Sequence, residues 1–202
     1  DHPVMKKGLE GFEGFAIEEE DTLRVQACLS PVWDTCLVLI ALLDSGMAPD
    51  DPDIQRSARW MLKEQILVGG DWQVKNKKGP PGGWAFEFHN DTYPDLDDTS
   101  EIVMALDRLE LPSNGSKSQA IQRAVDWLLG MQSSNGGWAS FDKDNTKALI
   151  AKLPFLDFGE TIDPPSVDVT AHILEMMGQL GFSANHPAVA RGLGYILREQ
   201  EE

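Results

Sequence analysis

Three aspartates and a threonine crowd into one short stretch, Asp95-Leu96-Asp97-Asp98-Thr99. Asp and Thr are common helix N-cap residues, and Asp98 with Glu101 resembles a capping box, so capping accounts for part of this cluster. Capping does not account for Asp95 and Asp97, which add negative charge at the same place. Because crowded carboxylates cannot all ionise cheaply, at least one is expected to stay protonated and to act as an acid in a dry cavity. Helix capping and acid catalysis both remain open.

A histidine further along the chain offers a partner for such an acid. His172 follows Asp168 and Thr170 in a segment that repeats the pattern around Asp98, so it is expected one helix away from the aspartate cluster. There it could hydrogen-bond an aspartate and stabilise the conjugate base. A lone histidine is also commonly a structural residue, and that interpretation stays open.

Metal binding receives little support from the sequence. The side chains that could ligate zinc show no typical ligand spacing; they are His2, His89, His172, His186, Cys28 and Cys36. The aspartate cluster resembles a magnesium-binding motif only superficially. No glycine-rich phosphate loop and no Ser/His/Asp triad is apparent. We expect no metal and no cofactor.

The composition restricts the class of partner. The 202 residues include 17 Lys+Arg and 33 Asp+Glu, and the net charge of −16 argues against a nucleic-acid binder and against a polybasic membrane anchor. No run approaches the roughly 20 apolar residues of a membrane-spanning helix. The two cysteines fit a reduced intracellular protein. Because the chain begins at Asp1, we interpret it as a fragment, so that missing targeting signals carry no weight.

Two series of similar residues recur along the chain. The first joins an arginine, an aromatic residue and a glutamine in residues 56–65, 123–132 and 191–200. In the second copy the glutamine is followed by Gly136-x-Trp138, and in the first copy Trp72 is expected to take the place of that tryptophan, one residue late. The other series consists of threonines that closely follow an aspartate, Thr35, Thr99 and Thr170. Two matching series at similar intervals indicate an internal structural repeat.

Each of these threonines opens a helical pattern. Residues 36–43 are apolar on all sides, which predicts a buried helix, whereas an apolar stripe follows Thr99 and Thr170. The arginine-led segments predict the second helix of each pair, with tryptophan and tyrosine side chains that pack. Such helical hairpins stack into a curved or closed double layer, and a closed ring would surround a cavity. The loops 69–94 and 138–167 are long enough to be functional.

Together these motifs resemble the squalene-hopene cyclase family of triterpene cyclases. The resemblance rests on the glutamine-tryptophan repeats, on Asp95-Leu96-Asp97-Asp98-Thr99, and on two further segments that end at Thr35 and His172. It extends from about residue 31 to residue 200. It implies an all-α fold in which helical hairpins form part of an (α/α)6 barrel, incomplete in this chain. Residues 1–29 would then connect from a preceding domain, and residues 30–202 would form the first half of the catalytic barrel.

The resemblance also implies roles for individual residues. Asp97 would protonate the terminal alkene of squalene, Asp95 and Asp98 would stabilise its deprotonated form, and His172 would hydrogen-bond Asp97. Two further aspartates would complete the polar network, Asp34 and Asp168. Five apolar side chains would bind substrate or line its path, Trp33, Phe86, Phe141, Phe155 and Leu156. Aromatic faces in the cavity could stabilise ring cations.

By the same resemblance, the activity is that of an isomerase, an intramolecular transferase that cyclises squalene to hopene or hopanol in hopanoid biosynthesis. The parent enzyme would bind the cytoplasmic side of a bacterial membrane peripherally, as a monotopic protein, with a homodimer as one allowed assembly. The isolated chain is expected to be inactive, because half of the ring is missing.

Two other functions stay open. One is a class II diterpene cyclase, which also uses an Asp-x-Asp-Asp motif but acts on geranylgeranyl diphosphate. The other is a non-catalytic helical-repeat binding module, in which Asp95 and Asp97 would point into bulk solvent.

Overall fold

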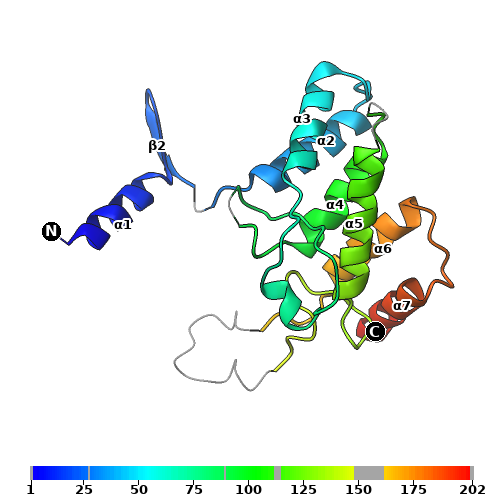
Figure 1. Cartoon of the computed structure of the whole chain (residues 1–202). Coiled ribbons are helices and arrows are strands. Elements are labelled where there is room, and N and C mark those ends of the chain that lie inside the picture. The colour runs from blue at the N-terminus through cyan, green and yellow to red at the C-terminus, as the bar shows by residue number, and fades with distance from the viewer. Residues whose placement is uncertain (1, 27, 89, 112–114, 148–161, 201–202) are drawn as a thin grey trace.

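The computed structural model describes residues 2–26, 28–88, 90–111, 115–147 and 162–200 (Figure 1). Its elements are α1 (Pro3–Glu13), β1 (Ala16–Glu19), β2 (Thr22–Val25), α2 (Pro31–Asp44), α3 (Pro52–Lys63), the 3-10 helix η1 (Asp71–Val74), α4 (Leu96–Asp107), α5 (Ser116–Met131), α6 (Val167–Gln179) and α7 (Pro187–Glu199). The described part of the chain is therefore mostly helical, as the sequence predicts. In this part, none of the helices has the length and apolar character needed to cross a membrane.

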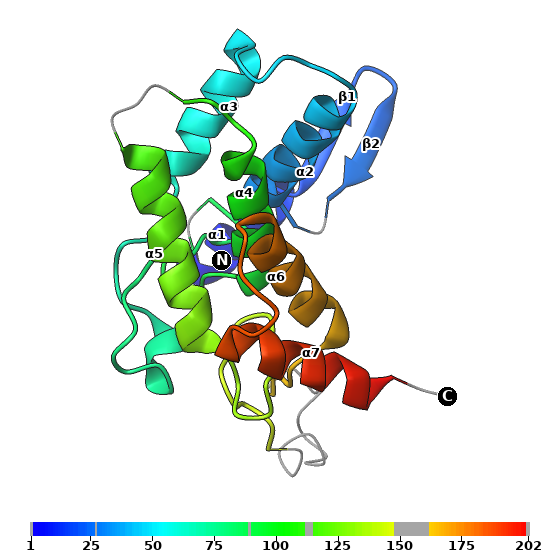
Figure 2. The ribbon, with the colours of Figure 1, turned by 90° about the vertical axis from the view of Figure 1, so that its right-hand side faces the viewer.

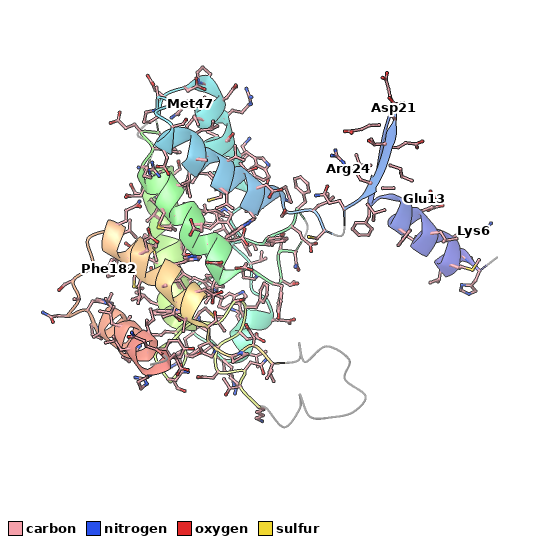
Figure 3. The ribbon with its side chains drawn as sticks, turned by 180° about the vertical axis from the view of Figure 1, so that it is seen from behind. Lys6, Glu13, Asp21, Arg24, Met47 and Phe182 are labelled. Carbon is pink, nitrogen blue, oxygen red and sulfur yellow. The ribbon has the colours of Figure 1, made fainter. Side chains whose placement is uncertain are left out.

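The first elements form an arm that projects away from the helical body (Figure 1). Helix α1 buries none of its residues, and the antiparallel hairpin that follows pairs Ala16 with Val25. Figure 3 shows the charged side chains of the arm extending into solvent. The hairpin is a departure from the all-α expectation, and the sequence analysis did not predict it. Its strands have four residues each, too short to produce a clear alternating pattern.

The helical body has two layers. Helices α2, α4 and α6 lie side by side, with α4 in the middle, and each is followed along the chain by the outer helix that it contacts (Figure 2). Outer helix α3 also contacts α5. The arrangement confirms stacked helical hairpins in which every unit contributes one inner and one outer helix.

Residues 36–43 form a helix as predicted, but the expectation that this helix is buried on all sides is wrong. Within α2, Leu37 and Val38 are exposed, the latter to 57% of its surface. Helix α4 is instead the buried one, and Ile102, Val103 and Leu106 are fully enclosed. The reason is position in the row, because α4 has an inner helix on both sides whereas α2 contacts only one among the described inner helices.

In the first two repeats, the glutamine links two neighbouring outer helices. Gln132 donates to the carbonyl oxygens of Gly136 and Ala188, and Arg191 donates to its side-chain oxygen. The indole N–H of Trp138 donates to the carbonyl of Leu128 at the end of the same outer helix. These contacts fix the angle between consecutive hairpins, since they join the end of one to the start of the next.

The preceding repeat makes the same contacts, but with a tryptophan other than the expected one. Gln65 donates to Gly82 and Ala120, Arg123 donates to Gln65, and the indole of Trp84 donates to the carbonyl of Met61. Trp84 therefore occupies the place predicted for Trp72. The prediction failed because the loop between glutamine and tryptophan is much longer in this repeat, which separates the two halves of the motif in sequence. Trp72 packs edge-on against Trp127.

Candidate active site

The start of α4 positions the aspartate cluster. Asp95 is the N-cap, and its side chain accepts hydrogen bonds from the backbone N–H groups of Asp97 at 2.7 Å and Asp98 at 3.2 Å. The predicted capping box of Asp98 and Glu101 does not form, because Asp98 lies inside the first helical turn. Capping is thus the role of Asp95, and the side chains of Asp97 and Asp98 remain available for other contacts.

A threonine attaches each of the inner helices α4 and α6 to the loop before it. The hydroxyl of Thr99 accepts from the backbone N–H of Trp84 at 2.9 Å and donates to the carbonyl of Asp95 at 2.6 Å. In the next unit Thr170 accepts from Trp138, also at 2.9 Å. In these two units the recurring threonine therefore fixes where the inner helix begins, and with it the position of the side chains in its first turn.

Asp97 and His172 meet between two inner helices. Helices α4 and α6 are packed together, and Nδ1 of His172 lies 2.7 Å from Oδ1 of Asp97. The two residues are far apart in the chain, so the repeat is what brings them together. Burial lowers the pKa of His172, but the hydrogen bond with Asp97 and the negative charges of Asp97, Glu101 and Glu175 outweigh it, and the net shift is upward.

The other two aspartates of the cluster are buried carboxyls. Asp95 is 8% exposed and Asp98 is 1% exposed, and Oδ1 of Asp98 has no hydrogen-bond partner in the described part of the chain. Burial is the largest cause that raises the pKa of Asp95 to about 7 and that of Asp98 to about 8, with neighbouring carboxylates adding to it. Two backbone hydrogen bonds oppose the rise at Asp95. The site can therefore retain a proton near neutral pH, as the crowded sequence indicates.

Glu101 also belongs to the site, although the sequence analysis gave it no role there. It lies one helical turn after Asp97, and its Oε1 lies 3.8 Å from Nδ1 of His172. Burial raises the pKa of Glu101, His172 lowers it, and Asp97 and Glu175 raise it. The signal in the sequence was the spacing of four residues between two carboxylates, which puts both on one helical face.

Three side chains of this site also have the spacing of a cation site. The ligand atoms of Asp97, Glu101 and His172 all lie within 4.8 Å of one another. The arrangement joins residues from two helices, so no spacing along the sequence could reveal it. Imidazole and carboxylate groups can ligate a divalent cation. The short contact between Asp97 and His172 equally suits a direct proton-sharing pair.

The remaining predicted aspartates make local contacts. Asp34 is exposed at the start of α2 and accepts a hydrogen bond from the hydroxyl of Ser30 at 3.0 Å. Asp168 is exposed at the start of α6, where a hydrogen bond from Ser166 is the main cause of its lowered pKa. In the described part of the chain neither is hydrogen-bonded to Asp97. Trp33 is partly buried next to Asp34.

A second carboxylate organises the loop that carries Phe141. Asp163 accepts backbone N–H groups from Phe141 and Asp142, each at 2.7 Å, and from Ser140 at 3.3 Å. The ring of Phe141 stacks on Tyr93 with 4.7 Å between centroids, a contact that the sequence analysis missed. This loop also holds the start of α4, because Ser140 accepts from the backbone of Leu96.

The structure gives less information on the other residues that were predicted to contact substrate. Phe86 is half-buried shortly after Trp84, whereas Phe155 and Leu156 lie outside the described residues. A surface pocket of about 400 Å³ beside Tyr93 has a mixed lining, in which Trp72 and Val74 lie among charged side chains such as Asp142 and Lys143, and it does not contain the aspartates of α4. These charged side chains make it a poor match for a hydrocarbon substrate.

Comparison with known proteins shows to which family this chain belongs. Residues 29–202 match the family model of the squalene-hopene cyclase C-terminal domain. The chain belongs to this family. It is 45% identical to the squalene-hopene cyclase of Alicyclobacillus acidocaldarius, over 99% of this chain and 32% of that protein.

Further relatives extend the range of products in the family. The chain is 42% identical to the squalene-hopene cyclase of Schizosaccharomyces japonicus, over the whole chain and 32% of that protein. It is 47% identical to the dammaradiene synthase of Dryopteris crassirhizoma, over 98% of this chain and 30% of that protein. The chain thus spans about a third of the length of these curated relatives. The names of these relatives include more than one triterpene cyclase activity, so membership in the family does not single out one product.

Proposed function

We propose that the protein containing this chain is a triterpene cyclase that protonates squalene at Asp97 and cyclises it to hopene or hopanol. The observation that carries the proposal is the 2.7 Å contact between Asp97 and His172, beside two buried carboxyls. Relatives that bear the name squalene-hopene cyclase support squalene as the substrate. The dammaradiene synthase leaves a second candidate product, because it is similarly identical to this chain.

The chemistry begins with a proton transfer. An alkene is a weak base, so it needs a strong acid held against it without competing water. Protonated His172 donates to Oδ1 of Asp97, and the Asp97 proton moves to a terminal alkene carbon. The π bond supplies the electrons of the new C–H bond, a tertiary cation forms, and the Asp97 carboxylate stays paired with His172. Proton transfer alone generates the cation, so this route calls for neither a metal nor a redox cofactor.

The later steps need a cavity more than further catalytic groups. Each remaining alkene attacks the neighbouring cation and closes one ring, and the last cation loses a proton to give hopene or captures water to give hopanol. Aromatic faces such as those of Phe86 and Phe141 would stabilise intermediate cations. Phe155, Leu156 and Trp33 would line the path of the substrate. Asp34 and Asp168 would contribute negative charge at the ends of neighbouring inner helices.

The binding-module alternative loses support from the burial of the cluster. That alternative requires Asp95 and Asp97 to point into solvent, whereas Asp95 is almost fully buried and Asp97 contacts His172. Peripheral attachment to the cytoplasmic side of a membrane and assembly as a homodimer remain part of the proposal. The isolated chain would be inactive, because the inner helices α2, α4 and α6 form an open row with an exposed apolar face on α2.

The proposal is tested by product analysis of the complete protein in D2O. Separate incubations supply squalene and geranylgeranyl diphosphate, and mass spectrometry with NMR identifies the products. We expect a pentacyclic triterpene from squalene with one deuterium on the ring carbon next to the gem-dimethyl carbon, because the exchangeable carboxyl proton adds to the CH carbon of the terminal alkene and leaves the tertiary cation on the dimethyl carbon. Product from geranylgeranyl diphosphate alone would establish the diterpene cyclase alternative. A triterpene without deuterium at that position would overturn initiation by protonation.

A further inference from the structure

We propose that Glu101 is a positioning residue, which holds His172 protonated and turned toward Asp97 while Asp97 transfers its proton. This inference rests on the proposed function. It assigns a task to a carboxylate that lies outside the cluster Asp95 to Asp98, one helical turn further along α4.

The geometry places Glu101 and Asp97 on the same side of His172. The two carboxylates are four residues apart on α4, and the same imidazole nitrogen, Nδ1, lies 2.7 Å from Asp97 and 3.8 Å from Glu101. The Nδ1 proton can point at only one acceptor with good geometry, and the shorter contact belongs to Asp97. Glu101 therefore attracts the charged ring without competing for its best hydrogen bond.

Burial makes this attraction effective. The side chain of Glu101 is 13% exposed, compared with 25% for Asp97 and 39% for His172. The thiol of Cys36 on α2 is buried, and its pKa is raised first by this burial and then by the charges of Glu101 and Asp98. The thiol is therefore neutral, and in the described part of the chain His172 is the cationic group that interacts with Glu101. Interactions between partly buried charges are screened less than those at the surface.

Apart from Glu101, the acidic groups that interact with His172 are either exposed to solvent or take part in the proton transfer. In the described part of the chain, the ionisable groups that interact with the ring are Asp97, Glu101, Asp168 and Glu175. Asp168 and Glu175 lie on the same helix as His172 and are exposed to solvent. Asp97 loses its own proton during the reaction, so before transfer it carries no charge to hold the imidazolium. Glu101 is the partly buried carboxylate that can do so in that state.

The test compares Glu101→Gln with Glu101→Asp in the complete protein, using squalene and following kcat against pH. Glu101→Gln should lower kcat about tenfold and move the alkaline limb of the profile about one pH unit toward acid, because His172 then loses its proton more readily. Glu101→Asp keeps the charge and should leave the limb near its wild-type position. Glu110→Gln, an exposed glutamate given the same substitution, is the matched control and should match the wild type.

An alkaline limb that does not move in Glu101→Gln would overturn the inference, as would a limb that moves equally in Glu101→Asp. Thermal unfolding shows whether either variant has lost its fold. If Glu101→Gln does not fold, the pH profile of Glu101→Asp can still be compared with that of the wild type. The role of Glu101 and the proposed function are refuted by different results. A protein that fails to cyclise squalene refutes that function, whereas normal pH behaviour of Glu101→Gln in an active enzyme refutes only the role of Glu101.

Discussion

At the scale of single residues, the carboxyl groups of the site differ in how deeply they are buried and in whether they contact His172. Asp95 caps α4, Asp98 is buried without a partner for one oxygen, and Asp97 contacts His172. The sequence predicted that such crowding would keep a proton in the cluster. Its assignment of helix capping to Asp98 and not to Asp95 was wrong, because capping depends on the residue at which the helix begins, and helix boundaries are poorly determined by sequence patterns.

The buried carboxyls should make the protein less stable as the pH rises. Their folded-state pKa values of about 7 for Asp95 and about 8 for Asp98 exceed the ordinary aspartate value of 3.8. Between these limits the folded state binds more protons than the unfolded chain, so the free energy of unfolding falls with increasing pH. Asp98→Asn should therefore raise Tm at pH 8 more than at pH 5, at about 1 °C per kcal/mol gained in a protein about three times as long as this chain.

Thermal unfolding of the complete protein at the two pH values measures this effect. Asp126→Asn is the control, since Asp126 is an exposed aspartate on outer helix α5. Equal pH dependence of Tm in the wild type and in Asp98→Asn would show that Asp98 is not a buried acid.

At the scale of elements, the repeat does most of the positioning. The threonines and glutamines of the two series make equivalent hydrogen bonds in two successive units. Their periodic recurrence allowed the sequence to predict the inner and outer helices. The tryptophan that belongs to the motif of Gln65 was misassigned because a long loop separates Gln65 from Gly82 and Trp84. The motif requires glycine at the position of Gly82. At the equivalent Gly136, whose φ is +98°, a Cβ would lie 2.6 Å from the carbonyl oxygen of Arg191.

The reassignment of the tryptophan predicts unequal effects of two matched substitutions. Trp84→Phe removes the indole donor to the carbonyl of Met61, which then keeps only its 3.2 Å hydrogen bond from the backbone N–H of Glu64, whereas the indole nitrogen of Trp72 has no partner in the described part of the chain. Trp84→Phe should thus reduce the free energy of unfolding by about 0.5–1.5 kcal/mol more than Trp72→Phe. Chemical denaturation of the two variants measures the difference. A larger loss in Trp72→Phe would restore Trp72 to the motif.

At the scale of the whole molecule, the sequence predicted which helices pair but not how deeply each helix is buried. The stacked hairpins and the meeting of α4 with α6 followed from the repeat. The burial of α4 and the exposure of α2 did not, because burial depends on how many neighbours a helix has and not on its own apolar residues. The same holds for Glu101, since only the packing of two helices brings it to His172.

The central claim is that Asp97 supplies the proton that starts cyclisation, and the rate of triterpene formation by Asp97→Asn tests it most directly. The amide is similar in shape but cannot donate the carboxyl proton, so turnover of squalene by the complete protein should fall about 10²–10⁴-fold. Asp126→Asn, assayed beside it, should retain the wild-type rate. Formation of the same triterpene by Asp97→Asn at the wild-type rate would contradict the account.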